Sequence, residues 1–199
     1  MRERQLLEIR RQLVHSMGSI IAPAIVFLGL DAVKNFYGFF LIMVVVLNLY
    51  RQTRSGNKTF ILEQFYIFEQ WMEKQLTKYE RGQEFLKGPI LYFLGVFVTM
   101  SLFSAEQVIP AILILALADA GSTVVGIVFG KHKHVWNKSS SWEGTITFFL
   151  FAFGVLFYFA PLEIAIFIAG TVALIESLPK IDDNISIPLS VAFLLSVLV

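Results

Sequence analysis

The chain has 199 residues, of which 56% are hydrophobic and 16% are charged, and its formal net charge is +1. A mean hydropathy of +0.70 excludes a soluble domain of average composition. Cysteine is absent, which excludes disulfides and thiolate chemistry. We therefore expect an integral membrane protein, with no nucleic-acid partner.

Apolar runs follow one another along almost the whole chain. A hydrocarbon core about 30 Å thick needs about 17–25 apolar residues per helix. The runs predict an all-α, multi-pass bundle of about seven transmembrane helices, at residues 16–30, 36–50, 89–103, 108–129, 145–160, 162–178 and 186–199. Several runs are short, so we expect them to extend into flanking residues, thin the bilayer or stop partway.

The segments between these runs suggest one domain, residues 1–199, without a cleavable targeting segment, since the N-terminus MRERQLLEIRRQL is charged too far in for a signal peptide. The long connection between the second and third runs contains FILEQFYIFEQWMEKQLTKY, residues 60–79. Its apolar residues recur at helical spacing, which predicts an amphipathic helix in the headgroup region. The alternative is an ordinary surface helix packed on the bundle.

The basic residues give the expected orientation. With the N-terminus inside, fifteen of the sixteen Lys and Arg residues fall on one side of the membrane, and only Lys34 falls on the other. Because Lys and Arg collect on the cytoplasmic side, we expect a cytoplasmic N-terminus and an active site that opens to the cytoplasm.

Two helical segments carry unusual polar residues. In EIRRQLVH, Glu8, Arg11 and His15 stand at i, i+3 and i+7 and so share one stripe of a helix, although a basic, membrane-anchoring helix has the same pattern. In the apolar run 108–129, Asp119 shares a face with Ser122 and Gly126. The small residues are explained by helix packing. The aspartate is not, because a carboxylate at that depth is costly and marks a functional site by default.

The loop GKHKHVWNKSSSWEGT, residues 130–145, combines lysines with hydroxyl side chains and Glu143. Backbone N–H groups, Lys and hydroxyls all donate to phosphate oxygens, so the composition suits a phosphate, although the spacing is not that of a Walker A loop. His132 and His134 are either metal ligands or, more commonly in a basic loop, interfacial side chains.

The turn before the last run reads IESLPKIDDNISIP and contains Glu176, Asp182, Asp183 and Asn184. Carboxylates beside an amide oxygen suit Mg²⁺, which is commonly bound by one or two carboxylates plus substrate phosphates. Taken alone, the turn is better interpreted as a helix cap.

All these groups lie on, or open toward, the predicted cytoplasmic side. Carboxylates for a metal, basic residues for phosphates and an apolar bundle for a lipid are what phosphoryl or nucleotidyl transfer to a lipid needs. A cation channel or transporter also buries carboxylates, but has less use for a basic, hydroxyl-rich loop on one face.

The four motifs, in this order, resemble the dolichol kinase, phytol kinase and CTP-dependent diacylglycerol kinase family, which is distantly related to the CDP-diacylglycerol synthases. The resemblance runs from Glu8 to Pro188. It implies a CTP-dependent polyprenol kinase that transfers the γ-phosphoryl group of CTP, with Mg²⁺, to the hydroxyl of a membrane isoprenoid alcohol or diacylglycerol.

Site residues carry over by motif position. Glu8, Arg11 and His15 occupy the family's E-x-R-R-K-x-x-H element, and the D-A-G and G-K element corresponds to Asp119, Gly121, Gly126, Gly130 and Lys131. Glu143 and Gly144 match its E-G element, and the final acidic element corresponds to Glu176, Asp182, Asp183 and Asn184. The chain departs from the pattern at Gln12 and Ser140, where the family usually has Lys, and Lys138 is the candidate substitute for the second.

The resemblance suggests a division of roles. Asp119, Asp182 and Asp183 would bind Mg²⁺ on the CTP phosphates, and Arg11, Lys131 and Lys138 would neutralise the remaining charge. His15 or Glu143 would take the hydroxyl proton. The rival functions are a cytidylyltransferase, which joins CMP to a lipid phosphate, and a non-enzymatic transporter or lipid-binding protein.

Overall fold

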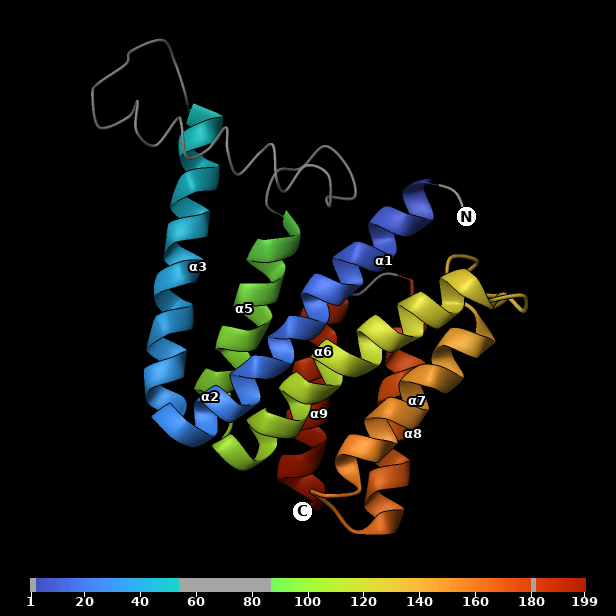
Figure 1. Ribbon diagram of the computed structural model, residues 1–199. Helices are drawn as coiled ribbons and strands as arrows, with labels where there is room; N and C mark the ends of the chain where they lie inside the picture. Colours follow the sequence, from blue (N-terminus) through green and yellow to red (C-terminus); the bar gives the residue numbers. More distant parts are fainter. Residues whose placement is uncertain (1–2, 54–86, 180–181) are drawn as a thin grey trace.

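The structure, a computed structural model, describes residues 3–53, 87–179 and 182–199 (Figure 1). The interfacial helix predicted at residues 60–79 lies outside the described residues. The described secondary structure consists of helices that run side by side, joined by short connections (Figure 1). They are α1 (Glu3–Ser16), η1 (Met17–Ile20), α2 (Ile21–Leu28), α3 (Leu30–Thr53), α5 (Lys87–Leu102), α6 (Ala105–Val128), α7 (Trp142–Leu156), α8 (Leu162–Glu176) and α9 (Asp183–Leu198).

The expected all-α helical bundle is confirmed, since each predicted span corresponds to a helix of the structure. The first boundary moves most, because α1, η1 and α2 follow one another without a break, and the apolar stretch begins at Gln5, not at residue 16. The chain reverses after α2 at Gly29, whose φ of 85° is a conformation that glycine adopts without strain. Glu8, Arg11 and His15 therefore belong to the same rod as the first predicted span.

Three helices in the described ranges are long and apolar enough to cross a membrane, namely Gln5–Leu28, Leu30–Leu49 and Ala105–Val128. Helices α5, α7 and α9 are shorter apolar helices of 10–17 residues. At 1.5 Å per residue, these shorter helices fall below the hydrocarbon thickness, as expected from the short runs in the sequence.

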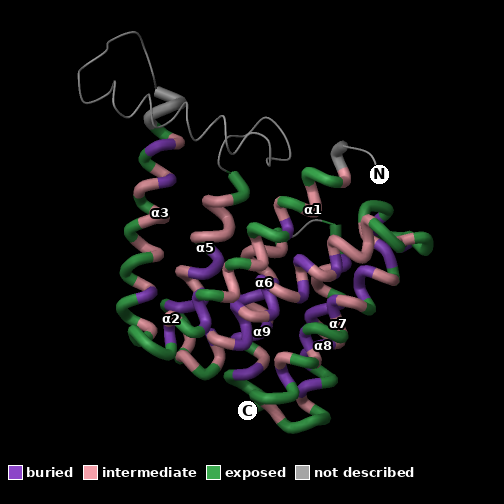
Figure 2. Tube along the Cα trace, viewed as in Figure 1, coloured by how far each residue is buried: buried purple, intermediate pink, exposed green. Residues whose placement is uncertain are grey.

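Helix α6 lies at the centre of the bundle and packs against α1, α2, α7 and α9 (Figures 1 and 2). Its apolar side chains are buried together with those of α7, α8 and α9. Helix α7 approaches α6 closely because Gly144 has no side chain: a Cβ there would lie 3.0 Å from the carbonyl oxygen of Ser122. The small residues of α6 thus face protein, as predicted from their spacing.

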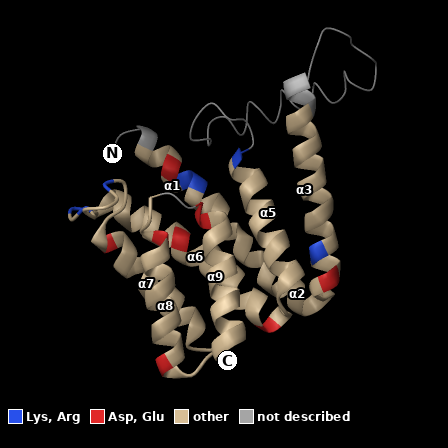
Figure 3. Cartoon of the chain, turned by 180° about the vertical axis from the view of Figure 1, so that it is seen from behind, with Lys and Arg blue, Asp and Glu red and all other residues tan. Residues whose placement is uncertain are grey.

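Charged side chains are distributed unevenly along the bundle. Among the described residues, Lys and Arg gather at the end where α1 begins and α6 ends, apart from Lys34 (Figure 3). Lys34 forms an ion pair of 2.6 Å with Asp31 in the first turns of α3. The arrangement agrees with the predicted one-sided distribution, and the cytoplasmic location of the basic end stays a prediction.

Candidate active site

A cavity of about 2340 Å³ opens at the basic end of the bundle. Its polar lining comes from α1, α6, the end of α8, the start of α9 and the loop between α6 and α7. Of the residues predicted for the site, it is lined by Glu8, Arg11, His15, Asp119, Gly126, Gly130, Glu176, Asp182, Asp183 and Asn184. Segments distant in sequence are therefore brought together as the four motifs predicted.

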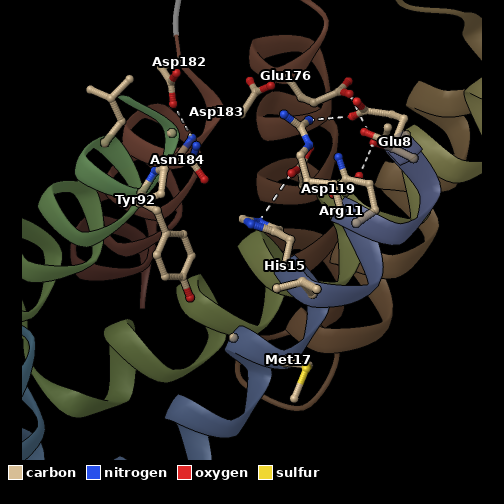
Figure 4. A pocket seen from close by; sticks show the side chains of 18 of the residues that line it. Glu8, Arg11, His15, Met17, Tyr92, Asp119, Glu176, Asp182, Asp183 and Asn184 are labelled. Atoms are coloured by element: carbon tan, nitrogen blue, oxygen red, sulfur yellow. Dashed lines mark hydrogen bonds and ion pairs between the residues drawn. The ribbon is translucent and has the colours of Figure 1, made fainter. Parts of the chain in front are cut away.

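The stripe on α1 faces this cavity. Arg11 Nη2 donates to Glu8 Oε1 at 2.5 Å, so the two side chains hold each other in place. His15 Nε2 lies 3.2 Å from the carbonyl oxygen of Leu115 and 3.4 Å from Asp119 Oδ2. Because a carbonyl only accepts, Nε2 carries the hydrogen in the first contact, which leaves Nδ1 of a neutral ring as the acceptor. Figure 4 shows His15 pointing from α1 toward Asp119.

Asp119 and Glu176 are linked through one hydroxyl. Ser122 Oγ lies 3.0 Å from the backbone oxygen of Asp119 and 3.2 Å from Glu176 Oε1, so it joins α6 to the end of α8. The Asp119 side chain is only 14% exposed. The other carboxylate oxygen of Glu176, Oε2, is buried and has no hydrogen-bond partner among the described residues.

The acidic turn serves as a helix cap and also lines the cavity. Asp182 Oδ1 accepts a hydrogen bond from the backbone N–H of Asn184 at 3.1 Å and so caps α9. Asp182, Asp183 and Asn184 all border the cavity, and in Figure 4 Asp182 and Asn184 lie on the side of Tyr92, across from Glu8. The structural reading of this turn and the functional one are thus compatible.

No group of three or more His, Cys, Asp or Glu side chains is placed to hold a metal ion within the ranges that the structure describes. The predicted set of Asp119, Asp182 and Asp183 is therefore not assembled as a metal centre of protein ligands alone. Mg²⁺ that arrives on a nucleotide needs only one or two carboxylates, because phosphates and water supply the rest. The donor set of the cavity fits an ion bound in that way.

Four predicted residues do not line the cavity. Glu143 accepts from the backbone N–H groups of Lys131 and His132, at 3.1 and 3.2 Å, and lies 2.7 Å from His132 Nδ1. It therefore fixes the loop after α6. The exposed side chains of Lys131 and Lys138 lie in this loop. At Gly121, an added Cβ would lie 3.0 Å from the ring of Phe151, so this glycine serves the packing of α6 on α7.

The two loop histidines point to different partners. His134 is 1% exposed, stacks on Trp136 with ring centroids 4.8 Å apart, and has Nε2 2.9 Å from Thr145 Oγ1. Burial lowers the pKa of His134. His132 contacts Glu143 instead. The pair therefore forms structural contacts within the loop.

Lys133 and Tyr92 are among the cavity-lining residues that the sequence did not single out. Lys133, not Lys131, lines the cavity, and its Nζ donates to the backbone oxygen of Ser139 at 3.3 Å. Nothing in the sequence distinguished the two lysines of GKHKH, since residues i and i+2 share one face of an extended segment. Tyr92 on α5 also lines the cavity. It stood in an apolar run, and no pattern singled it out.

The fold is a membrane-type helical bundle, and its cavity is bordered both by charged and by apolar side chains. The chain is 30% identical over 137 residues to phytol kinase 1, chloroplastic, of Arabidopsis thaliana, covering 59% of this chain and 45% of that protein. It is 28% identical over 218 residues to a probable phytol kinase of Zea mays, and the match covers 97% of this chain and 69% of that protein. It is 31% identical over 140 residues to the farnesol kinase of Arabidopsis thaliana, and the match covers 60% of this chain and 45% of that protein.

These relatives confirm the resemblance seen in the motifs: at modest identity, the chain is similar to phytol and farnesol kinases. The chain spans about half the length of most of the curated relatives it matches. No protein-family model and no solved structure matches it.

Proposed function

We propose that the protein is a prenol kinase, which transfers the γ-phosphoryl group of CTP to the hydroxyl of a membrane isoprenoid alcohol. Its homology to phytol and farnesol kinases supports the class of reaction. The observation that carries the proposal is the cavity itself, because one continuous space is bordered by charged residues at one end and by apolar residues at the other. Such a space suits a nucleotide that meets the head of a lipid.

The basic residues and the carboxylates of the cavity divide the work on the nucleotide. Arg11 and Lys133 border the polar end and would neutralise phosphate oxygens. Asp119, with Asp182 or Asp183, would hold Mg²⁺, which supplies charge neutralisation on the transferring group. Lys131 and Lys138 stay candidates for contacts at the entrance, since their exposed loop adjoins the cavity.

The reaction forms one P–O bond and breaks another. The alcohol oxygen bonds to the γ-phosphorus, the bond to the β-phosphate oxygen breaks, and CDP leaves. The alcohol proton passes to a base, and of the two predicted bases His15 borders the cavity while Glu143 is occupied with the loop. His15 is therefore the better candidate, although a loose phosphoryl-transfer transition state demands little of a base.

The test is thin-layer analysis of the purified protein incubated with Mg²⁺, γ-³²P-labelled CTP and a panel of farnesol, phytol, geranylgeraniol, dolichol and diacylglycerol. We expect label in a prenyl phosphate. A parallel reaction contains α-labelled CTP and phosphatidic acid. Label in a CDP-lipid there, with none in the alcohols, would overturn the kinase and indicate a cytidylyltransferase.

A single substitution tests the assignment of Asp119. Asp119→Asn keeps the size of the side chain and removes its charge, so we expect turnover to fall by about 10²–10³-fold, as for loss of one electrostatic group in an active site. Glu163→Gln is the matched control, because Glu163 is an exposed carboxylate in the first turn of α8, away from the cavity. A fully active Asp119→Asn enzyme would remove Asp119 from the mechanism.

A further inference from the structure

The cavity continues beyond the polar residues into an apolar groove. This groove is lined by Ile21 and Ala24 of α2, Val33 and Phe36 of α3, and Phe93 of α5. Phe36 is 56% exposed and Leu28, also on the lining, is 69% exposed. In a membrane these outer side chains face acyl chains, so the groove opens sideways into the bilayer, not into water.

Tyr92 and Gly18 stand at the junction of the two parts. The Tyr92 ring lies edge-on to His15, with ring centroids 5.3 Å apart, so Tyr92 contacts the polar end of the cavity. Its hydroxyl lies over Gly18 of η1: a Cβ at Gly18 would overlap the hydroxyl oxygen, would lie 3.4 Å from Cζ, and would lie 3.7 Å from Ala116 Cβ. Figure 4 shows Tyr92 projecting from α5 across this space. We call Gly18 and Tyr92, which both line the cavity, the neck.

We propose that the neck admits the single isoprenoid tail of the acceptor alcohol, with its hydroxyl at His15 and Asp119 and its chain in the apolar groove. This inference rests on the proposed kinase function and names the shape of its substrate. One groove beyond one neck receives one chain, so a diacylglycerol, whose two acyl chains branch close to the hydroxyl, does not fit. Tyr92 and Gly18 are thereby specificity-determining residues.

The geometry of the neck provides its own test. In Gly18→Ala, we expect the new methyl group to push the Tyr92 hydroxyl, which is hydrogen-bonded to the Tyr37 side chain, away from Gly18 and so to narrow the passage. Removing that hydroxyl in Tyr92→Phe leaves Cζ as the nearest atom, at 3.4 Å, which is an ordinary van der Waals contact. The double variant Gly18→Ala/Tyr92→Phe should therefore regain the passage that the single variant loses.

The experiment compares kcat/KM for geranylgeraniol, whose chain must pass the neck, with that for 3-methylbut-2-en-1-ol, whose chain ends before it. For Gly18→Ala we expect a loss of about tenfold or more with geranylgeraniol and little change with the short alcohol. The double variant should recover most of the loss. Equal losses with both alcohols, or no recovery in the double variant, would overturn the neck, as would wild-type activity on diacylglycerol equal to that on geranylgeraniol.

A second measurement does not depend on phosphoryl transfer. A geranylgeraniol analogue with a benzophenone at its tail end should crosslink to peptides of α2, α3 or α5, with competition by unlabelled phytol. Gly18→Ala should lower this labelling and the double variant should restore it. Crosslinking only outside these helices would overturn the groove. Labelling in the groove by a wild-type protein that phosphorylates no alcohol would instead keep the groove and refute the proposed kinase.

Discussion

Gly95 fixes the position of the acidic turn of the candidate site. It is buried on α5, where the first turn of α9 crosses it. A Cβ at this position would overlap the carbonyl oxygen of Asn184 and would lie 2.9 Å from the carbonyl carbon of Asn184 and 3.1 Å from Ile185 Cα. All three are backbone atoms, which cannot rotate away as a side chain does. We therefore predict that Gly95→Ala displaces the start of α9.

The magnitude follows from these contacts. Carbon atoms pack at about 3.5–4.0 Å, so α9 has to withdraw by about 1 Å for the methyl group to fit. Overpacking of this kind costs about 1–3 kcal/mol. In a protein of this size, that corresponds to a fall of about 2–12 °C in the apparent Tm. Because Asp183 and Asn184 move with the helix, phosphoryl transfer should fall more than stability alone explains.

The assay is the fraction of monodisperse protein in detergent after heating, together with the labelled-CTP reaction below the transition. Gly154→Ala in α7 is the matched control, since a Cβ there meets nothing within 4 Å. We expect this control to be neutral or slightly stabilising, because alanine favours helices over glycine by about 1 kcal/mol. If Gly95→Ala matched Gly154→Ala in both Tm and activity, the close approach of α5 to α9 would be refuted.

Two further predictions concern the loop after α6 and the orientation of the chain. Glu143→Gln should loosen the loop, because an amide oxygen is a weaker acceptor for the backbone N–H groups that Glu143 now binds. We expect trypsin to cleave this variant faster than the wild type at Lys131 or Lys138. An unchanged cleavage rate would count against the anchoring role of Glu143. The chain has no cysteine, so single cysteines report the orientation cleanly. Val135→Cys, at a 90% exposed position, should react with a membrane-impermeant maleimide from the cytoplasmic side, and Glu163→Cys from the other side; labelling of both from one side would refute the predicted topology.

Most of the helical architecture could be predicted because apolar runs and helices coincide in a membrane protein. The runs located the described helices other than α1, and the small residues around Ser122 and Gly126 predicted the protein-facing side of α6. The first apolar run was drawn from residue 16, and the helix predicted from the charged stripe continues into it without a break, because α1 is amphipathic. Hydropathy alone ends a span at such residues, whereas the backbone continues through them.

The sequence predicted which polar groups converge, and the roles assigned to them stay predictions. Ten of the predicted residues border the cavity, because motif order and predicted side place them together. Glu143 and Gly121 do not border the cavity, since a motif residue can also stabilise the fold. Glu143 accepts hydrogen bonds from loop N–H groups, and Gly121 leaves space for the Phe151 ring. The choice of Lys133 over Lys131 depends on the course of an irregular loop, which spacing does not determine.

Two buried acceptors bear on what the cavity binds. Gln12 Oε1 and Glu176 Oε2 have no hydrogen-bond partner among the described residues, and both side chains border the cavity. A buried acceptor left unpaired is costly, so a ligand that brings a donor gains affinity from these positions. The amino group of a cytosine is such a donor in either reaction, since both use CTP; an alcohol hydroxyl is a donor that only the kinase reaction brings. We therefore expect these two acceptors to contact the cytosine or the alcohol hydroxyl of the proposed kinase reaction. Gln12 in particular presents an acceptor where the family usually has the positive charge of a lysine.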